Sequence, residues 1–489
     1  MAVVVSIDAG TTGVRAFALN ENGEQVALSY KEFRQYYPRP GWVEHDAAEI
    51  WASVQSTLLE LMSVLDEPVA AVGITNQRET IVAWSRTSNE PLCNAIVWQD
   101  LRTSDQCDQL LDAGWLDQIR QTTGLVINPY FSGTKIEWLI KNHSVEVSPD
   151  LAFGTIDSWL IWKLSGGSTH ATDVTNASRT LLYDINQACW SQELCELFGV
   201  PASSLPEIRP SSGRFAMTAD TTALGAGVPI SGVAGDQQSA LFGQACLEPG
   251  MTKNTYGTGS FVLMNVGTTC PDPVEGLLTT VAWDLGAGPV FALEGSVFVT
   301  GAAIQWLRDG LGVIGDASEI SDLARSVDNT GGVFFVPAFA GLGSPWWDPR
   351  ARGTIIGITG GTGRAELALA VVEAMAFQTR DVVEAMTQAG GMPVSEMRVD
   401  GGAAVMDLLL QIQADQLGVR VARPIITETT AQGAAMLAGL AEGIWADTQE
   451  ISATWQLDQA FEPRDNRSES DAVHQDWLRA VTRSRNWAI

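Results

Sequence analysis

The feature that most constrains the fold of this sequence is a hairpin pattern that occurs twice. The run VVVSIDAG turns at Gly10, continues as GVRAFALN and turns again at Asn22-Gly23, which are residues typical of tight hairpin turns. The segment KNTYGTGSFVLMNVG, residues 253–267, repeats the arrangement around a Gly-Thr-Gly tip. Such a repeat predicts an internal duplication, with one hairpin opening each half.

Strand and helix patterns alternate in both halves. VAAVGITNQRETIVAW is typical of strands and KIEWLIKN of a helix, and the same mixture recurs after residue 270, which favours an α/β organisation throughout. The connector CLEPG, residues 246–250, has the Gly and Pro chemistry of a turn. Because 489 residues with 45% hydrophobic content can fill two cores, we predict domains at residues 1–246 and 247–489.

Charge and cysteine usage argue against several classes of protein. A formal net charge of −28 without a basic block opposes binding to nucleic acid or anionic lipid. No apolar run reaches the roughly 18 residues of a membrane span, and the start lacks the basic region of a signal peptide. The six cysteines form no CxxC pair, so neither a disulfide framework nor a zinc cluster is predicted. We expect a cytoplasmic protein with reduced thiols.

The first hairpin tip carries groups suited to phosphate and metal. Thr11 and Thr12 offer hydroxyl donors beside bare glycine backbone, and Asp8 can hold a metal through water. Arg15, on the outgoing strand, can neutralise phosphate charge. Each tip taken alone is better explained by a plain structural turn. Together, opening two α/β halves, they favour a nucleotide held between domains.

A third element, VDGGAA at residues 399–404, runs from a strand through a Gly-Gly turn into a helix. The helix N-terminus and its glycines can receive the adenosine or the α-phosphate of a nucleotide, although an ordinary strand-to-helix turn has the same pattern. Neither GxxxxGK[ST] nor the Gly-rich loop of protein kinases occurs, so both of those phosphate-binding chemistries are disfavoured.

Asp236, in VAGDQQSALFG, is the candidate general base for transfer of phosphate to an alcohol. It follows the strand-like run PISGVAG, and open α/β sheets place functional groups at such strand ends. The structural alternative is a helix N-cap.

A neutral polyol needs hydrogen-bonding groups for its hydroxyls and an apolar wall for its carbons. Arg78-Glu79 in GITNQRET supplies opposite charges side by side, although such neighbours also occur as ordinary surface charges. Trp98, Tyr130 and Phe261 can form the wall, although each alone is typical of a protein core.

The ordered combination of DAGTT, NQRET, VWQDLR, AGDQQ, YGTGSF, LEGSVFVTGAAIQWLRD and VDGGA resembles the FGGY carbohydrate kinase family, and within it the kinases that act on glycerol. The stretches YFSGTKIEWLIKN and GTIIGITGGTGRAELALAVVE resemble the two signature patterns of that family. The resemblance implies two duplicated ribonuclease-H-like domains, of the actin and Hsp70 ATPase type, flanking a catalytic cleft. It also implies ATP-dependent phosphorylation of glycerol to sn-glycerol 3-phosphate, with MgATP as the phosphoryl donor. Glycerol specificity rests on NQRET.

The resemblance also implies roles for individual residues. The glycerol hydroxyls would be held by Arg78, Glu79, Tyr130, Asp236 and Gln237, with Trp98 and Phe261 against the carbons and Asp236 as the base. The nucleotide would contact Thr11, Thr12, Gly13 and Arg15 from the first half, and Thr258, Gly301, Gln305 and Gly402 from the second. Asp8 would hold Mg²⁺ through water.

Three features depart from the family pattern. Met406 stands where the family has an asparagine facing the adenine, so it can pack against the base but cannot form the amide hydrogen bonds. The stretch ADTTALGAGVPISG lacks the arginine of kinases inhibited by fructose 1,6-bisphosphate, so we expect no such inhibition. The tail does not match the segment with which some relatives bind a sugar-transport regulator. The family resemblance implies a homo-oligomer, either a dimer or a tetramer.

Three other functions compete with this interpretation. A kinase of the same family acting on a pentulose or sugar acid is disfavoured by Arg78-Glu79 and Trp98. A non-catalytic nucleotide switch on the same fold would not need Asp236 or the polyol-lining residues. A carbohydrate-binding module would leave both hairpin tips unexplained.

Overall fold

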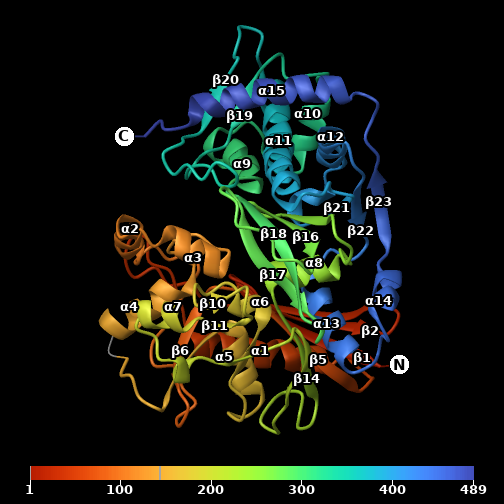
Figure 1. Cartoon of the computed structure of the whole chain (residues 1–489). Coiled ribbons are helices and arrows are strands. Elements are labelled where there is room, and N and C mark those ends of the chain that lie inside the picture. The colour runs from red at the N-terminus through yellow and green to blue at the C-terminus, as the bar shows by residue number, and fades with distance from the viewer. Residues whose placement is uncertain (1, 143–144, 489) are drawn as a thin grey trace.

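The computed structural model describes residues 2–142 and 145–488, and its first large sheet lies in the N-terminal half (Figure 1). The strands of this sheet are β1 (Val3–Ala9), β2 (Gly13–Asn20), β3 (Gln25–Glu32), β5 (Val69–Asn76), β13 (Ser212–Met217) and β14 (Pro229–Gly235). Their order is β13-β14-β5-β1-β2-β3. β1, β2 and β3 form an antiparallel meander, whereas β5 runs parallel to β1 and β14 runs parallel to β5. Because β1 and β2 are covered on both faces, their sequences are nearly continuous apolar runs.

The second large sheet repeats this plan. Its strands are β15 (Met251–Tyr256), β16 (Ser260–Gly267), β17 (Leu278–Asp284), β18 (Pro289–Val297), β21 (Glu396–Asp400), β22 (Val421–Pro424) and β23 (Leu457–Phe461). Their order is β17-β18-β16-β15-β21-β22-β23. Again an antiparallel meander, β15-β16-β18, is followed by two parallel strands, β21 and β22. The predicted duplication is therefore confirmed at the level of strand order.

Helices between the strands cover the sheets at equivalent positions. α1 (Ala47–Met62) packs on β2 and β3, and it begins where the Asp46 carboxylate accepts hydrogen bonds from two backbone N–H groups. α11 (Arg364–Gly390) packs on β16 and β18 of the second sheet. It begins where Glu366 bonds back to the Gly363 N–H and ends at Gly391, whose φ of 64° suits glycine. α12 (Asp407–Leu417) lies beside α11.

Two equivalent helices join the halves: α8 (Asp236–Gly243) follows β14, and α13 (Thr429–Ala441) follows β22. α13 packs on α8 and on strands of the first sheet, so a late segment lies among early strands (Figure 1). A Cβ atom on Gly433 would collide with the Ser239 carbonyl oxygen, and one on Gly243 with the Thr429 carbonyl oxygen. The glycines of α8 and α13 therefore allow the two helices to pack closely.

Smaller elements complete each half. Strands β4 (Glu44–His45), β6 (Ile81–Ser85), β7 (Ala95–Ile96) and β8 (Leu151–Thr155) form a four-stranded sheet in the first half. The short strands are β9 (Ala171–Asp173), β10 (Tyr183–Asp184), β11 (Cys189–Trp190), β12 (Glu207–Arg209), β19 (Phe334–Val336) and β20 (Thr354–Ile356). The other α-helices are α2 (Ser104–Asp112), α3 (Leu116–Thr123), α4 (Ser132–Asn142), α5 (Ile156–Leu164), α6 (Val174–Ala177), α7 (Gln192–Leu197), α9 (Gly301–Gln305), α10 (Glu319–Arg325), α14 (Thr448–Thr454) and α15 (Arg467–Ser484). The shorter helical turns are η1 (Ala202–Ser204), η2 (Trp306–Gly310) and η3 (Gly402–Val405).

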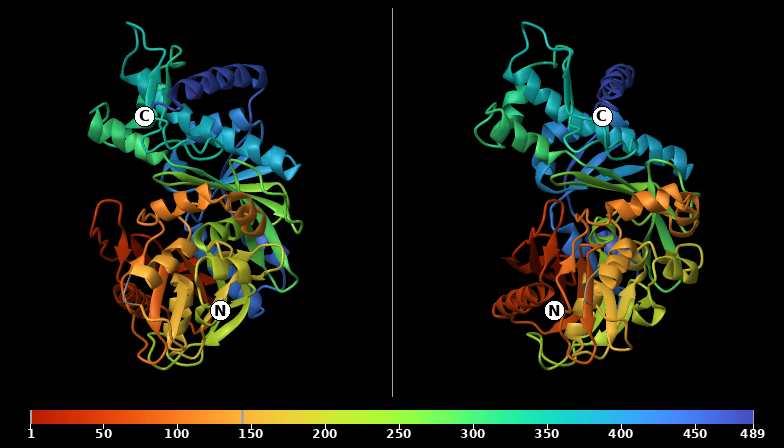
Figure 2. Two further views of the ribbon diagram at one scale, coloured as in Figure 1. Left: turned by 60° about the vertical axis from the view of Figure 1, so that its left-hand side comes forward. Right: turned by 90° about the vertical axis from the view of Figure 1, so that its left-hand side faces the viewer.

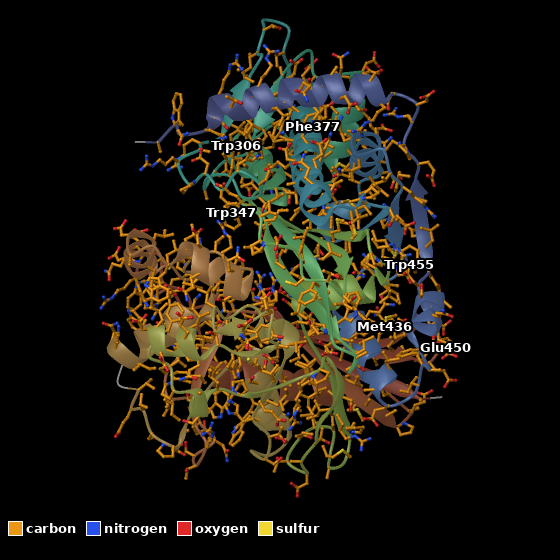
Figure 3. All side chains as sticks on the ribbon, in the orientation of Figure 1. Trp306, Trp347, Phe377, Met436, Glu450 and Trp455 are labelled. Atoms are coloured by element: carbon orange, nitrogen blue, oxygen red, sulfur yellow. The ribbon has the colours of Figure 1, made fainter. Side chains whose placement is uncertain are left out.

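The last helix, α15, lies at the opposite end of the molecule from β1–β3 in all three views (Figures 1 and 2). Trp477 of α15 is fully buried and donates its indole N–H to Asp381 of α11 at 2.9 Å. Phe377, labelled in Figure 3 among the helices of this half, lies 5.4 Å from the Trp477 ring. Among the helices in the described part of the chain, none combines the length and apolar character that a membrane crossing requires.

Candidate active site

Arg78 lies at the centre of a buried cluster of charges. It follows β5, and only 2% of its side-chain surface is exposed. Its Nε lies 3.3 Å from Asp236 Oδ1 and 3.5 Å from Glu79 Oε1, and its Nη2 donates to the Tyr130 hydroxyl at 3.1 Å. The structure therefore brings four of the predicted glycerol contacts together, and the adjacent charges of Arg78 and Glu79 are not a solvated surface pair.

The second half supplies the carboxylate that balances this cluster. Glu294 of β18 is fully buried and accepts hydrogen bonds from both terminal nitrogens of Arg78. It also accepts from Arg179 Nη2 at 2.9 Å, while Arg179 Nε donates to Glu79 Oε1 at 2.8 Å. The two guanidinium groups hold the pKa of Glu294 down, to about 2, against the raising effect of burial. Two buried arginines thus alternate with two buried carboxylates across the boundary between the halves.

Asp236 is the first residue of α8, directly after the buried strand β14. Its position matches the predicted strand end, and Gly235 rather than Asp236 occupies the N-cap. The Gln237 backbone N–H donates to Asp236 Oδ1 at 2.7 Å. Although 29% of the side-chain surface is exposed, burial raises the pKa of Asp236 to about 6, and the Arg78 charge opposes that shift. Such a carboxylate is mostly ionised at neutral pH and able to accept a proton.

Aromatic rings surround this cluster. The Trp98 and Tyr130 rings meet edge to face with centroids 5.4 Å apart, and the Arg78 guanidinium carbon lies 6.0 Å from the Phe261 centroid. The turn that carries Tyr130 is fixed by Lys135 of α4, whose ammonium donates to the backbone oxygens of residues 129, 130 and 131. The predicted apolar wall is therefore assembled beside the charges.

The first hairpin tip adjoins the aromatic wall. The Trp98 indole N–H donates to Thr11 Oγ1 at 2.9 Å, so a predicted alcohol contact bonds directly to a predicted phosphate contact. Arg15 pairs with Asp8 at 3.0 Å and with Glu428, just before α13, at 2.9 Å. Burial raises the pKa of Asp8 to about 6, and the Arg15 charge opposes that shift.

Buried and half-buried side chains support the backbone of this tip. Gln35 Nε2 donates to the Thr11 carbonyl at 2.8 Å, and Gln77 Nε2 donates to the Gly10 carbonyl at 3.1 Å. His45 contacts both glutamines through its two ring nitrogens. Burial lowers the pKa of His45 to about 4, so the ring is neutral at physiological pH and one nitrogen donates while the other accepts.

Hydrogen bonds between uncharged groups hold the second tip. The Gly257 N–H donates to the Gly259 carbonyl at 2.8 Å, and the Gly301 N–H of α9 donates to the Gly257 carbonyl at 3.1 Å. Thr258 is exposed, as is Gln305 at the other end of α9. The structure therefore brings Thr258 and Gly301 together at one end of the second sheet.

The Gly-Gly turn after β21 meets the same end of the sheet. A Cβ on Gly401, whose φ is 87°, would collide with the backbone of Tyr256, whereas one on Gly402 would meet open space. Met406, at the start of α12, is only 8% exposed and belongs to the core cluster of this half. Little of its side chain is therefore available to a nucleotide base.

These groups fit MgATP as a set. Two glycine tips present backbone N–H groups and threonine hydroxyls, Arg15 can offset phosphate charge, and Asp8 can contact a hydrated metal. No group of three or more metal-binding side chains occurs within residues 2–142 and 145–488.

Sequence reasoning missed Arg179, Glu294, Lys253 and Glu428. Glu294 lies within the motif LEGSVFVTGAAIQWLRD, and Lys253 opens the second hairpin pattern. These two are charged residues in otherwise apolar or β-prone segments, which was the available signal, whereas Arg179 and Glu428 stand in polar segments without such a signal.

Comparison with known proteins agrees with this geometry. The model of the FGGY family of carbohydrate kinases matches with its N-terminal domain at residues 3–243 and its C-terminal domain at residues 252–442. Glycerol kinase 2 of Thermotoga maritima is 52% identical over 100% of this chain and 99% of its own length. The glycerol kinase of Dechloromonas aromatica is 53% identical over 99% and 98%, respectively. The crystal structure of Plasmodium falciparum glycerol kinase with ADP has a TM-score of 0.95 at 35% identity and covers 99% of this chain and 98% of that one. This chain belongs to the FGGY family of carbohydrate kinases.

Proposed function

We propose that this protein is a glycerol kinase, which transfers the γ-phosphoryl group of MgATP to a terminal hydroxyl of glycerol and yields sn-glycerol 3-phosphate. The observation that carries the proposal is the convergence of Arg78, Tyr130 and Asp236 within about one hydrogen-bond length, beside the aromatic wall. A small polyol suits a site that combines fixed polar groups with an apolar surface. Full-length identity above 50% to glycerol kinases supports the same substrate.

The alcohol is held by groups that are already oriented. All three nitrogens of Arg78 have partners, so a glycerol hydroxyl would replace one of its longer contacts, such as that with Asp236 or the 3.3 Å contact with Gln238. The described contacts of Glu79 both use Oε1, which leaves Oε2 as an acceptor. Trp98 and Phe261 would cover the carbon atoms.

Asp236 would act as the general base. Its contacts with Gln237 and Arg78, among the described residues, both involve Oδ1, so Oδ2 can take the hydroxyl proton. As the O–H bond breaks, the alcohol oxygen bonds to the γ-phosphorus, and the bond to the β-phosphate oxygen breaks with its electron pair leaving on ADP.

The nucleotide would be held from both halves. Thr11, Thr12, Gly13 and Arg15 would contact the phosphates from the first tip, and Thr258, Gly301, Gln305 and Gly402 would receive the rest of the nucleotide from the second half. Mg²⁺, held through water by Asp8, would offset the charge of the phosphate oxygens. A cytoplasmic location, a homo-oligomeric state and insensitivity to fructose 1,6-bisphosphate stay predictions.

The test is ATP consumption measured side by side with glycerol, ribulose, xylulose and gluconate, with the phosphorylated product identified. We expect turnover with glycerol alone. Turnover with a sugar or sugar acid instead would overturn the substrate, and tight ATP binding without turnover on any of the four would overturn the enzymatic function.

A further inference from the structure

Lys253 is a buried cation without a role in the proposed reaction. It lies on β15, in the first hairpin of the second half, and it is fully buried. Its side chain reaches α8 in the first half, where its Nζ donates to Gln237 Oε1. A second N–H of the same ammonium donates to Thr255 Oγ1 at 3.0 Å. One lysine thus connects the sheet of the second half to a residue predicted to hold the alcohol.

The chemistry of an ammonium group fixes how the Gln237 amide is turned. A lysine ammonium has three N–H donors and no acceptor, so only the oxygen of an amide can face it. With Oε1 bound to Lys253, the NH₂ group of Gln237 is the end left for another partner. Gln237 is half-buried at the start of α8, next to Asp236. Its NH₂ group can therefore donate to an oxygen, whereas one of the two acceptor positions of its carbonyl is already taken by Lys253.

The position of Lys253 is costly for a merely structural residue. Removing an ammonium from water costs several kcal/mol, whereas an unbranched apolar side chain would fill the same space without that penalty. Three carboxylates, Asp400, Asp236 and Glu294, interact with the buried charge and favour its protonated form. Burial lowers the pKa of Lys253, although only to about 8, so most of the ammonium stays protonated at neutral pH.

We propose that Lys253 is a positioning residue that fixes the Gln237 amide so that its NH₂ group donates to a hydroxyl oxygen of the alcohol. This inference rests on the proposed function for its substrate. It assigns to the second half a polar part in binding the alcohol, beside the predicted apolar contact of Phe261 on β16 and the predicted part of this half in binding the nucleotide. The alcohol would meet Gln237 as a donor and Asp236 as an acceptor, which makes the two neighbouring residues complementary rather than interchangeable.

A double-mutant cycle tests the inference. Lys253→Met should raise KM for the alcohol about tenfold, the equivalent of one charge-assisted contact, while KM for ATP changes much less. In a Gln237→Ala background the same substitution should have no further effect on KM for the alcohol, because Lys253 acts through Gln237. Lys253→Arg keeps a cation that can donate to Oε1, so it should recover part of the lost affinity.

Lys163→Met serves as the matched control, because Lys163 lies on α5 and donates to the Asn89 carbonyl outside the site. If Lys253→Met leaves KM for the alcohol unchanged, or raises it equally with and without Gln237, the inference is overturned. Should Lys253→Met fail to fold, Gln237→Glu decides. A carboxylate keeps a bond to Lys253 but has no N–H, so KM should rise without a loss of melting temperature, and an unchanged KM would contradict the inference.

The cycle is measured with whichever alcohol the wild-type protein phosphorylates. A failure of the glycerol assignment would then change the substrate in the assay, whereas a failure of the Lys253 inference would appear as independent effects of the two substitutions. The two outcomes are distinguishable in one set of measurements.

Discussion

The two hairpins that open the halves share a strand order but differ in chemistry. The first has Asp8 and Arg15 on its strands, paired with each other at 3.0 Å. The second has Lys253 on β15 as its charged residue, and the backbone of its tip, Gly257, Thr258 and Gly259, forms hydrogen bonds with other backbone groups. The two halves therefore begin with hairpins of similar backbone structure, and the charged groups predicted to contact phosphate and metal lie on the first hairpin.

The difference does not make the first half self-sufficient. Its arginines Arg78 and Arg179 are buried, and both bond to Glu294 from the second half. Arg15 pairs with Glu428, and Gln237 bonds to Lys253, which also come from the second half. Buried charges need partners, and here the partners cross the boundary between the halves. Neither half can therefore build this site alone.

The largest effect on turnover is expected at Asp236, the proposed general base in the first half. Asp236→Asn should lower kcat about 10²–10⁴-fold, because it removes the general base but nearly preserves the shape of the side chain. Steady-state kinetics would measure the loss, and calorimetry should find glycerol affinity largely kept. Asp66→Asn, in an exposed loop after α1, is the control. A kcat near that of the wild type would refute the assignment of the base.

The next largest effect, on stability, is expected from removal of Glu294, the carboxylate that Arg78 and Arg179 share. Glu294→Ala would leave two buried guanidinium groups without their common partner and should lower the free energy of unfolding by about 3–5 kcal/mol. Glu462→Ala breaks an exposed contact with Arg420 and should cost less than about 1 kcal/mol. Denaturant unfolding compares the two variants, and equal stabilities would show that the cluster does not bind the halves together.

Gly401 and Gly402 test whether the turn after β21 in the second half contributes to nucleotide binding. Gly401→Ala should cost about 1–3 kcal/mol of stability, because its φ is 87° and Tyr256 occupies the space of a side chain. Gly402→Ala meets open space, so it should leave stability nearly unchanged and raise KM for ATP. Thermal unfolding and kinetics separate these effects. Similar results for both variants would remove the nucleotide role predicted for this turn.

The smallest effect is expected from loss of the hydrogen bond between Trp98, a predicted alcohol contact, and Thr11, a predicted phosphate contact. Trp98→Phe keeps a ring but removes the indole N–H that Thr11 accepts at 2.9 Å. We expect KM to rise for both glycerol and ATP by about fivefold, the equivalent of one hydrogen bond. Steady-state titration of each substrate measures this. A rise for glycerol alone would mean that this bond does not link the two substrates.

The sequence was sufficient to predict the repeated meander, the α/β class and the gathering of Arg78, Tyr130 and Asp236. Local turn chemistry and apolar patterning indicate the meander and the α/β class, and the ordered family motifs indicate that the three side chains share one site. The partners of the buried charges could not be predicted. Arg78 and Glu294 are separated by 216 positions, and only the folded chain brings them together. The same holds for Arg15 and Glu428, which meet because α13 packs on the first sheet.

The most direct test of a site built from both halves is the pH dependence of kcat/KM for glycerol, which reports the ionisation of the free enzyme. The base must be ionised, and the pKa of Asp236 is raised to about 6, so kcat/KM should rise with pH and level off above that value. In Glu294→Gln, Arg78 loses its main counter-charge and should stabilise ionised Asp236 more strongly, which moves the acid limb to lower pH. A profile that is flat across about pH 5–7, or an acid limb that does not move in Glu294→Gln, would contradict the account.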